Sequence, residues 1–363
     1  MKQKRFTFLL LFVANLFCAS AQKWYTPEID QKVEDLLKQM TVEEKLGYIG
    51  GVNWMYTKSI DRLGIHRMKM SDGPQGLGTD GKSTAYPSTV TLAATWNENL
   101  AYQYGKALGR DCRARNVNVI LGPAVNIYRA PMCGRNFEYM GEDPYLTSRI
   151  CVGYIKGVQD QGVMATVKHF VANNSDYDRN NISNDIDERT LNEIYFPAYK
   201  AAIQEAEVGA VMTSYNLMNG IYTTENPWLL KEVLRNQWGF KGLVMSDWGS
   251  THYCVPAAKG GLDLEMAGGE KMNPKDMAYY LKTGDVTMDM VDEKVRHILR
   301  ILIAFGFKDG TQADKNIPLD DPKSAETALN VAREGLVLLK NENNILPLNP
   351  KKYKHIIVTG KNA

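Results

Sequence analysis

Cysteine is scarce in this sequence, with five in 363 residues. One of them, Cys18, lies near the start, and the others are widely scattered at Cys112, Cys133, Cys151 and Cys254. They lack the close spacing of zinc ligands and the dense pattern of a disulfide-stabilised scaffold. We therefore expect thiols in the core or at the surface, and no metal site built from cysteine.

Long apolar runs are also scarce. Phe6–Phe17 follows three basic residues and precedes the small residues Ala19-Ser20-Ala21, an arrangement typical of a secretory signal peptide. The run is too short to span a membrane, and Cys18 fits a lipoprotein site poorly. We expect residues 1–21 to be removed near Ala21 and the product to be exported, periplasmic or secreted. Because no later stretch reaches membrane-spanning length, we expect no stable membrane anchor.

An excess of positive charge is missing as well. Without the three basic residues of positions 1–21, 43 − 3 = 40 basic side chains face 41 acidic ones. No basic stripe remains, which argues against nucleic acid as a partner. No glycine-rich phosphate loop opens a helix, which argues against an open doubly wound sheet that binds a dinucleotide.

Short apolar runs and helical patterns alternate along most of the chain. Runs that predict buried strands are Val117–Pro123, Gly162–Phe170, Gly209–Asn216, Gly242–Met245 and Gly260–Met266. Helices are expected at Pro27–Met40, Val42–Gly47, Thr91–Asn116, Leu146–Gln161, Glu188–Glu207, Pro227–Trp238 and within Pro274–Phe305. Such alternation implies a parallel sheet, and about six or seven units are close to the eight of a (β/α)8 TIM-like barrel. We predict this α/β fold for residues 22–308.

The last part of the chain differs in composition. Residues 309–353 contain several prolines and one helical pattern at Ala325–Asn341, so we expect an exposed linker. Residues 354–363 begin with a buried-strand pattern that has no partner behind it. We expect them to be the first strand of a second α/β sandwich domain that is missing from this chain.

The stretch Gly242–Ser250, GLVMSDWGS, is the most informative one. An apolar strand stops at Asp247, which lies beside Trp248 and is followed by Gly249. A carboxylate at the end of a buried strand is costly, and it is expected where it performs chemistry. The alternative is that Asp247 caps the next helix or turn.

Other strand ends carry polar residues in the same way: Asp72, Lys168-His169, Tyr215-Asn216 and Glu265. In a (β/α)8 barrel the carboxyl ends of the strands share one face, so these groups converge on one pocket. Each of them alone could serve a turn, an ion pair or packing. The loop between Asn126 and Tyr145 adds Arg135, which could pair with a carboxylate, and Glu138.

At these residues the sequence resembles glycoside hydrolase family 3, in its β-glucosidase branch. The motifs are Lys69-Met-Ser-Asp-Gly-Pro-Gln-Gly, Gly134-Arg-Asn-Phe-Glu-Tyr-Met-Gly-Glu-Asp-Pro-Tyr-Leu, Val167-Lys-His-Phe, Asp187-Glu-Arg-Thr-Leu-Asn-Glu-Ile-Tyr, Met212-Thr-Ser-Tyr-Asn and Val244-Met-Ser-Asp-Trp. Their order matches the family from about residue 30 onward. The resemblance implies hydrolysis of terminal β-D-glucosyl residues of β-glucosides, with no metal and no organic cofactor.

The resemblance also implies roles for single residues. Asp247 is implied as the nucleophile that forms a covalent glycosyl-enzyme, and Asp72 as the group that holds sugar hydroxyls deep in the pocket. The remaining implied sugar-site residues are Arg135, Lys168, His169, Met212, Tyr215 and Trp248, with Glu138 in a supporting role. Lys168 and Arg135 would favour the ionised form of Asp247.

A retaining glycosidase needs a second carboxyl group as acid and base. In two-domain members of the family the second domain supplies it, so we expect it outside this chain. Single-domain relatives use a histidine in a Pro-Gly-His-Gly loop, whereas this loop reads Val171-Ala-Asn-Asn-Ser-Asp-Tyr-Asp. Asp176 and Asp178 lie there, but nothing singles them out.

Other functions remain open from the sequence. Asp72 in Ser-Asp-Gly-Pro favours a β-glucosidase, with a β-xylosidase or another exo-β-glycosidase of the family as the alternative. A barrel lyase that forms a Schiff base on Lys168 would use the same face. A barrel that binds a sugar with little turnover is the alternative outside the enzymes.

Overall fold

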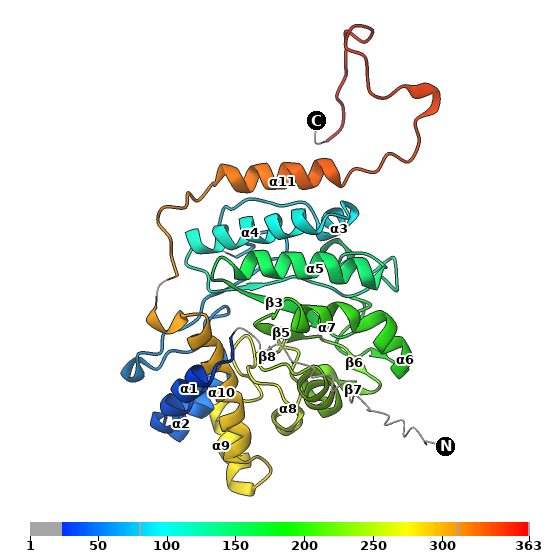
Figure 1. Ribbon diagram of the computed structural model, residues 1–363. Helices are drawn as coiled ribbons and strands as arrows, with labels where there is room; N and C mark the ends of the chain where they lie inside the picture. Colours follow the sequence, from blue (N-terminus) through cyan, green and yellow to red (C-terminus); the bar gives the residue numbers. More distant parts are fainter. Residues whose placement is uncertain (1–23, 80, 311, 362–363) are drawn as a thin grey trace, which may run out of the picture.

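The centre of the molecule is a parallel sheet of five strands in the order β1-β2-β3-β5-β8 (Figure 1). The computed structural model describes residues 24–361 apart from 80 and 311, so the expected signal peptide lies outside the described residues. The strands are β1 Met70–Asp72, β2 Val119–Leu121, β3 Met164–Phe170, β5 Ala210–Thr213 and β8 Leu243–Met245. Almost every residue in them is buried, as continuous apolar runs predict for a parallel sheet that is covered on both faces.

Isolated bridges take the place of the remaining strands. The expected strand Gly260–Met266 was wrong as a regular strand, because Leu264 pairs only with Met245 and Glu265 only with Gly50. The segment that begins at Gly50 continues to Met55, and the carbonyl of Met55 accepts the N–H of Met70 in β1 at 2.8 Å. Backbone hydrogen bonds therefore lead from β8 back to β1, and the fold is TIM-barrel-like without eight regular strands in the described chain.

A tight hairpin lies beside β1. Val52 and Tyr56 pair in antiparallel fashion, and two of the three residues between them, Asn53 and Trp54, have φ of 49° and 68°. Left-handed backbone of this kind allows the chain to reverse tightly.

Helices cover the outside of the sheet (Figure 1). The α-helices are α1 Pro27–Gln39, α2 Val42–Tyr48, α3 Thr89–Ala94, α4 Glu98–Ala114, α5 Pro144–Gln159, α6 Glu188–Thr190, α7 Pro197–Gln204, α8 Cys254–Gly260, α9 Pro274–Thr283, α10 Met288–Ala304 and α11 Pro322–Glu334. Two π-helices, Leu191–Tyr195 and Trp228–Gln237, and short 3-10 turns join them. Where the sequence predicted one helix over Thr91–Asn116 there are two, because Trp96 has φ of 53° and Asn97 caps a new helix.

A second, three-stranded sheet ties two loops together beside the carboxyl ends of the central strands. It consists of β4 Ser183–Asn184, β6 Leu217–Met218 and β7 Ile221–Tyr222. Ser183 pairs with Leu217 and Asn184 with Met218, so the loop after β3 is fixed to the loop after β5.

The region expected as an exposed linker is exposed only in part. Helix α11 packs on α3 and α4, with Val331 buried and an Arg110–Asp321 ion pair at its start. It ends at Glu334, seven residues before the predicted end at Asn341. The helix expected within this region is therefore present, and its buried side packs on the barrel.

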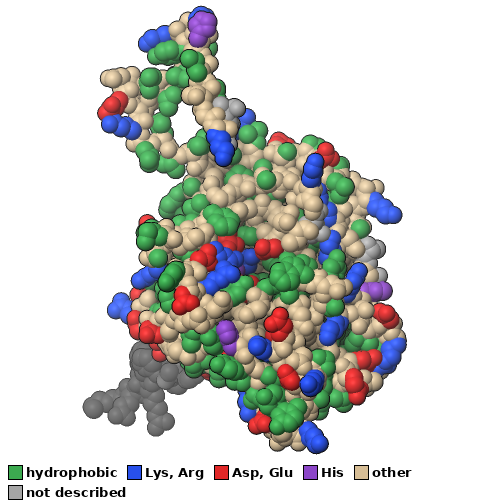
Figure 2. Space-filling model, turned by 180° about the vertical axis from the view of Figure 1, so that it is seen from behind, with side chains coloured by type: hydrophobic (Ala, Val, Ile, Leu, Met, Phe, Trp, Pro, Cys, Tyr) green, Lys and Arg blue, Asp and Glu red, His purple; other side chains and the backbone are tan. Residues whose placement is uncertain are grey.

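Beyond α11 the chain stands clear of the body with apolar side chains uncovered (Figure 2). Residues 354–360 form no strand, and Ile356, Ile357 and Val358 are exposed. A strand needs a neighbour to pair with, and no described segment lies beside this one. The start of a second domain here stays a prediction.

The four described cysteines are free thiols. Within residues 24–361, leaving out the two undescribed positions, no helix is long and apolar enough to cross a membrane.

Lys294, on α10, is a buried cation at the amino-terminal side of β8. Its Nζ donates to the carbonyls of Ala258 and Leu262, both at 2.7 Å, and burial lowers its pKa to about 8. Between pH 8 and the ordinary lysine value of 10.5, the unfolded chain therefore binds more protons than the folded chain.

We expect Lys294 to make the protein more stable as the pH rises through this window. Relative to Lys294→Met, the wild type should gain on the order of 2 kcal/mol in free energy of unfolding from pH 7 to pH 10. Urea unfolding of both proteins at the two pH values measures this gain. Lys282→Met, at the exposed end of α9, is the control that should show no gain. Equal pH dependence of Lys294→Met and the wild type would contradict the prediction.

Candidate active site

Five polar or sulfur-containing side chains meet at the carboxyl ends of the central strands. Asp72 ends β1, Lys168 and His169 lie near the end of β3, Met212 lies in β5, and Asp247 follows β8 by two residues. A cavity of about 300 Å³ opens at this edge. Its lining consists of Trp54, Met55, Asp72, Thr79, Leu121, Arg135, Lys168, Arg179, Met212, Tyr215, Asp247 and Trp248.

Asp247 is 7% exposed, and its two carboxylate oxygens have different surroundings. Oδ1 accepts the backbone N–H of Trp248 at 2.7 Å and the hydroxyl of Tyr215 at 3.0 Å. Oδ2 is buried without a hydrogen-bond partner among the described residues, and Nε2 of His169 and Nη1 of Arg135 lie 3.4 and 3.8 Å from it. The carboxylate is thus hydrogen-bonded through one oxygen only.

Burial raises the pKa of Asp247 above the ordinary aspartate value. The charges of Arg135 and Lys168 and the hydrogen bonds from Trp248 and Tyr215 oppose this rise. Each of these groups favours the carboxylate over the acid and so limits the rise in the pKa of Asp247.

Two cations and two carboxylates in and beside the cavity wall form a compact network. Nζ of Lys168 lies 2.9 Å from Oδ1 of Asp72 and 3.7 Å from Oε2 of Glu138. Arg135 forms an ion pair with the other oxygen of Glu138. Burial alone would lower the pKa of Lys168, but the two carboxylates raise it above the ordinary value. Lys168 is therefore a protonated amine whose charge is shared between Asp72 and Glu138.

His169 is fully buried beside this network and does not line the cavity. Nη2 of Arg135 donates to its Nε2 at 2.8 Å, and its Nδ1 lies 3.3 Å from the hydroxyl of Tyr139. Burial and the cations Arg135 and Lys168 hold its pKa well below the usual range. His169 is thus a neutral ring with its proton on Nδ1, and it orients Arg135 from behind.

The structure brings the predicted site residues together. Asp72, Arg135, Lys168, Met212, Tyr215, Asp247 and Trp248 line the cavity, and His169 and Glu138 support it from behind. Glu265, the other strand end that the sequence singled out, instead accepts backbone N–H groups of Lys271 and Met272.

The sequence reasoning missed Trp54, Met55, Thr79, Leu121 and Arg179. Two of them had a detectable signal. Leu121 lies within the expected strand Val117–Pro123, and Arg179 lies in the polar loop directly after β3. Trp54 and Met55 lie at the left-handed hairpin, which no apolar or turn pattern marked.

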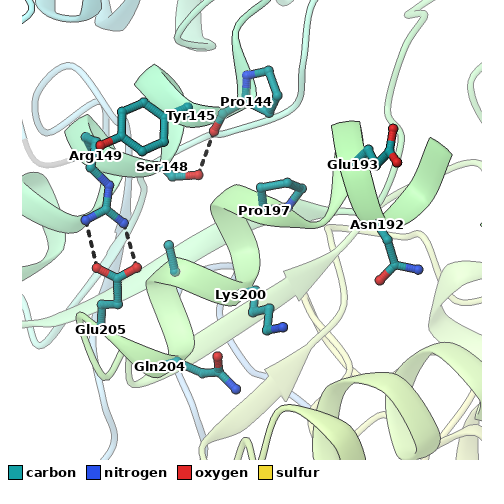
Figure 3. Close-up of a pocket in the computed structure, with 11 residues that line it drawn as sticks. Pro144, Tyr145, Ser148, Arg149, Asn192, Glu193, Pro197, Lys200, Gln204 and Glu205 are labelled. Carbon is teal, nitrogen blue, oxygen red and sulfur yellow. Dashed lines mark hydrogen bonds and ion pairs between the residues drawn. The ribbon is translucent and has the colours of Figure 1, made fainter. Parts of the chain in front are cut away.

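A larger hollow of about 510 Å³ lies elsewhere, between α5 and α7 on the outside of the barrel (Figure 3). Its most prominent charged groups, Arg149 and Glu205, bind each other through two hydrogen bonds of 2.8 and 2.6 Å. Because these charges satisfy each other, the smaller cavity around Asp247 is the better candidate for chemistry.

The cavity offers carboxylate, ammonium and guanidinium groups to a small ligand with many hydroxyls, and one nucleophilic oxygen. The described residues contain no cluster of three or more His, Cys, Asp or Glu side chains that could hold a metal ion.

Comparison with known proteins gives a consistent result. The β-glucosidase of Rhizobium radiobacter is 42% identical over 337 residues, which cover 91% of this chain and 41% of the relative. Thermostable β-glucosidase B of Acetivibrio thermocellus is 40% identical over 328 residues, covering 87% and 43%. The structure of β-glucosidase 3B from Thermotoga neapolitana in complex with α-D-glucose matches with a TM-score of 0.81 at 37% identity, covering 88% and 48%.

This chain therefore spans less than half the length of these relatives. The glycosyl hydrolase family 3 N-terminal domain matches residues 39–301, which include every strand of the central sheet and all the residues that line the cavity. The chain belongs to glycosyl hydrolase family 3.

Proposed function

We propose that this protein is a retaining β-glucosidase that releases terminal β-D-glucosyl residues through a covalent intermediate on Asp247. The carboxylate of Asp247, which lines a small polar cavity and keeps one oxygen without a hydrogen-bond partner among the described residues, is the observation that carries the proposal. Oδ2 forms a bond to the anomeric carbon while the bond to the leaving oxygen breaks and takes its electron pair with it. Water then hydrolyses the glycosyl ester.

The other cavity residues suit a sugar ring. Asp72 and Lys168 can accept and donate hydrogen bonds to neighbouring hydroxyls, and Arg135 can donate from its planar fork. Met212 and Trp248 offer apolar surface to the faces of the ring. The names of the relatives, all β-glucosidases, favour glucose over xylose as the sugar.

The proton donor is a separate question. Asp72 and Asp247 are the carboxylates in the described cavity lining, and Lys168 holds the pKa of Asp72 below its usual range against the effect of burial. An acid that is ionised at neutral pH donates protons poorly. We therefore propose that the acid/base is not among the described cavity residues, and that substrates with poor leaving groups react slowly without it.

The structure disfavours a Schiff base on Lys168. A lysine nucleophile must lose its proton, whereas two carboxylates raise the pKa of this one. The remaining alternatives are a β-xylosidase and a sugar-binding barrel with little turnover.

We expect the chain to be labelled covalently by 2,4-dinitrophenyl 2-deoxy-2-fluoro-β-D-glucoside, whose leaving group departs without a proton. Intact-protein mass spectrometry should show one added fluoroglucosyl group, and peptide mapping should place it on Asp247. The corresponding xyloside should label more slowly. Faster labelling by the xyloside would favour the xylosidase, and glucose binding without labelling would favour the sugar-binding barrel.

We also propose that the protein is exported, to the periplasm or beyond. The basic, apolar and small-residue order of positions 1–21 supports this. Fractionation of cells that express the full chain, with sequencing of the mature amino terminus, tests it: a start near residue 22 is expected, and an uncleaved cytoplasmic product contradicts it.

A further inference from the structure

The loop after β3 carries Arg179, whose guanidinium lies against Tyr215, the hydrogen-bond partner of Asp247. Arg179 lines the cavity, and its guanidinium carbon lies 4.0 Å from the centre of the Tyr215 ring. The hydroxyl of the same ring donates to Oδ1 of Asp247 at 3.0 Å. A guanidinium over an aromatic face is attracted by the ring, and it restricts rotation of the side chain beneath it.

The fold fixes this stack from two sides. The pairs between β4 and β6 join the loop that carries Arg179 to the loop that carries Tyr215. Oδ1 of Asp176 accepts a hydrogen bond from Nη1 of Arg179 at 3.2 Å. Asp176 also lies close to Gly134, in the loop that bears Arg135. A Cβ atom added at Gly134 would lie 2.9 Å from Oδ2 of Asp176. Arg179 is therefore anchored between the loop that bears Arg135 and the ring of Tyr215.

Tyr215 needs such support because it is only partly buried. A tyrosine ring turns about two side-chain bonds, and packing on one side alone would leave its hydroxyl free to swing away from the carboxylate. If it moved, Oδ1 would lose one of its two donors, and the carboxylate could rotate and exchange its free oxygen for the bound one.

We propose that Arg179 is a positioning residue for the nucleophile. Its guanidinium, anchored by Asp176, holds the Tyr215 ring so that the hydroxyl stays on Oδ1 of Asp247 and Oδ2 stays free to attack. The inference rests on the proposed function and adds a residue that acts on Asp247 through Tyr215.

The rate of labelling by 2,4-dinitrophenyl 2-deoxy-2-fluoro-β-D-glucoside tests the inference. We expect Arg179→Gln to lower the maximal labelling rate about 3- to 30-fold, which corresponds to the energy of a cation–π contact. The reagent concentration that gives half the maximal rate should change less than about twofold. Arg179→Lys, which keeps the charge, should restore part of the rate. Arg189→Gln, at a side chain that is 83% exposed on α6, is the matched control and should label like the wild type.

A double-variant comparison separates positioning from direct contact with the sugar. In a Tyr215→Phe background, where no hydroxyl remains to be positioned, Arg179→Gln should cause little further loss. Asp176→Ala, which removes the acceptor of the Arg179 hydrogen bond and keeps the guanidinium, should slow labelling in the same direction and serves if Arg179→Gln folds poorly.

Four outcomes overturn the inference. An unchanged rate in Arg179→Gln and Asp176→Ala would remove the role of Arg179, while labelling of the wild type would leave the proposed function intact. A full, additive loss in the Tyr215→Phe background, or a weakened affinity with an unchanged maximal rate, would make Arg179 a sugar-binding group. A wild-type chain that is not labelled would overturn the proposed function and the inference with it.

Discussion

Replacing Asp247 with alanine is expected to lower the rate of 2,4-dinitrophenyl β-D-glucoside cleavage by roughly 10⁴-fold or more, because the reaction loses the atom that forms the intermediate. The cavity would keep Lys168, Arg135 and Asp72, so binding of glucose should persist. Release of dinitrophenolate, followed by its absorbance, measures the rate.

Azide makes this prediction more specific. The alanine variant leaves room where Oδ2 of Asp247 lies, and a small anion can enter there and attack the anomeric carbon directly. We expect added azide to restore dinitrophenolate release and to yield α-glucosyl azide, with inverted configuration. Asp178→Asn, at an exposed carboxylate of the loop after β3, should behave as the wild type. Formation of β-glucosyl azide, or full activity of Asp247→Ala, would contradict the role of Asp247 as the nucleophile.

Replacing Glu138 with leucine is expected to destabilise the protein by about 3–5 kcal/mol, because it leaves two buried cations without their shared carboxylate. Glu138 is 4% exposed, forms an ion pair with Arg135 and lies 3.7 Å from Nζ of Lys168. Removal of one partner from a buried network costs far more than removal of an exposed pair. Urea unfolding at pH 7 measures the loss.

The same substitution should also slow labelling of Asp247, since Arg135 loses the group that fixes it near Oδ2. Glu142→Gln provides the control, because Glu142 belongs to the same loop and is exposed. If Glu138→Leu unfolded at the same urea concentration as the wild type, the network would be a feature of the site without a part in the stability of the fold.

The core of this site could be predicted from the sequence because polar residues at the carboxyl ends of parallel strands lie at one edge of the sheet. Lys168, Tyr215 and Asp247 each follow an apolar run, and parallel strands place such residues at one edge. Arg135 was noted in the charged loop before Tyr145 and Trp248 beside Asp247, and the family motifs that surround them implied their roles. The burial of each strand and the caps at Thr41 and Asn97 are likewise local properties of the sequence.

The parts that could not be predicted depend on contacts between distant segments. The cation of Arg179 becomes part of the site only because β4 pairs with β6, and a two-residue pair leaves no pattern in the sequence. Trp54 enters the cavity wall because a hairpin reverses at two left-handed residues. A helix was expected in the region of α11, but its packing on α3 and α4, with Asp321 paired to Arg110, joins segments that are far apart in the sequence.

The bridge between Gly50 and Glu265 has a consequence for the order in which this protein folds. The two residues are 265 − 50 = 215 positions apart in the sequence, and their pairing completes the path of hydrogen bonds from β8 to β1. During synthesis, Gly50 must wait until residue 265 has left the ribosome before it finds this partner. Contacts of such long range form slowly, whereas the hairpin that carries Trp54 has its partners in β1 close by in the sequence. Closure of the ring of hydrogen bonds therefore depends on the late-synthesised segment around Glu265.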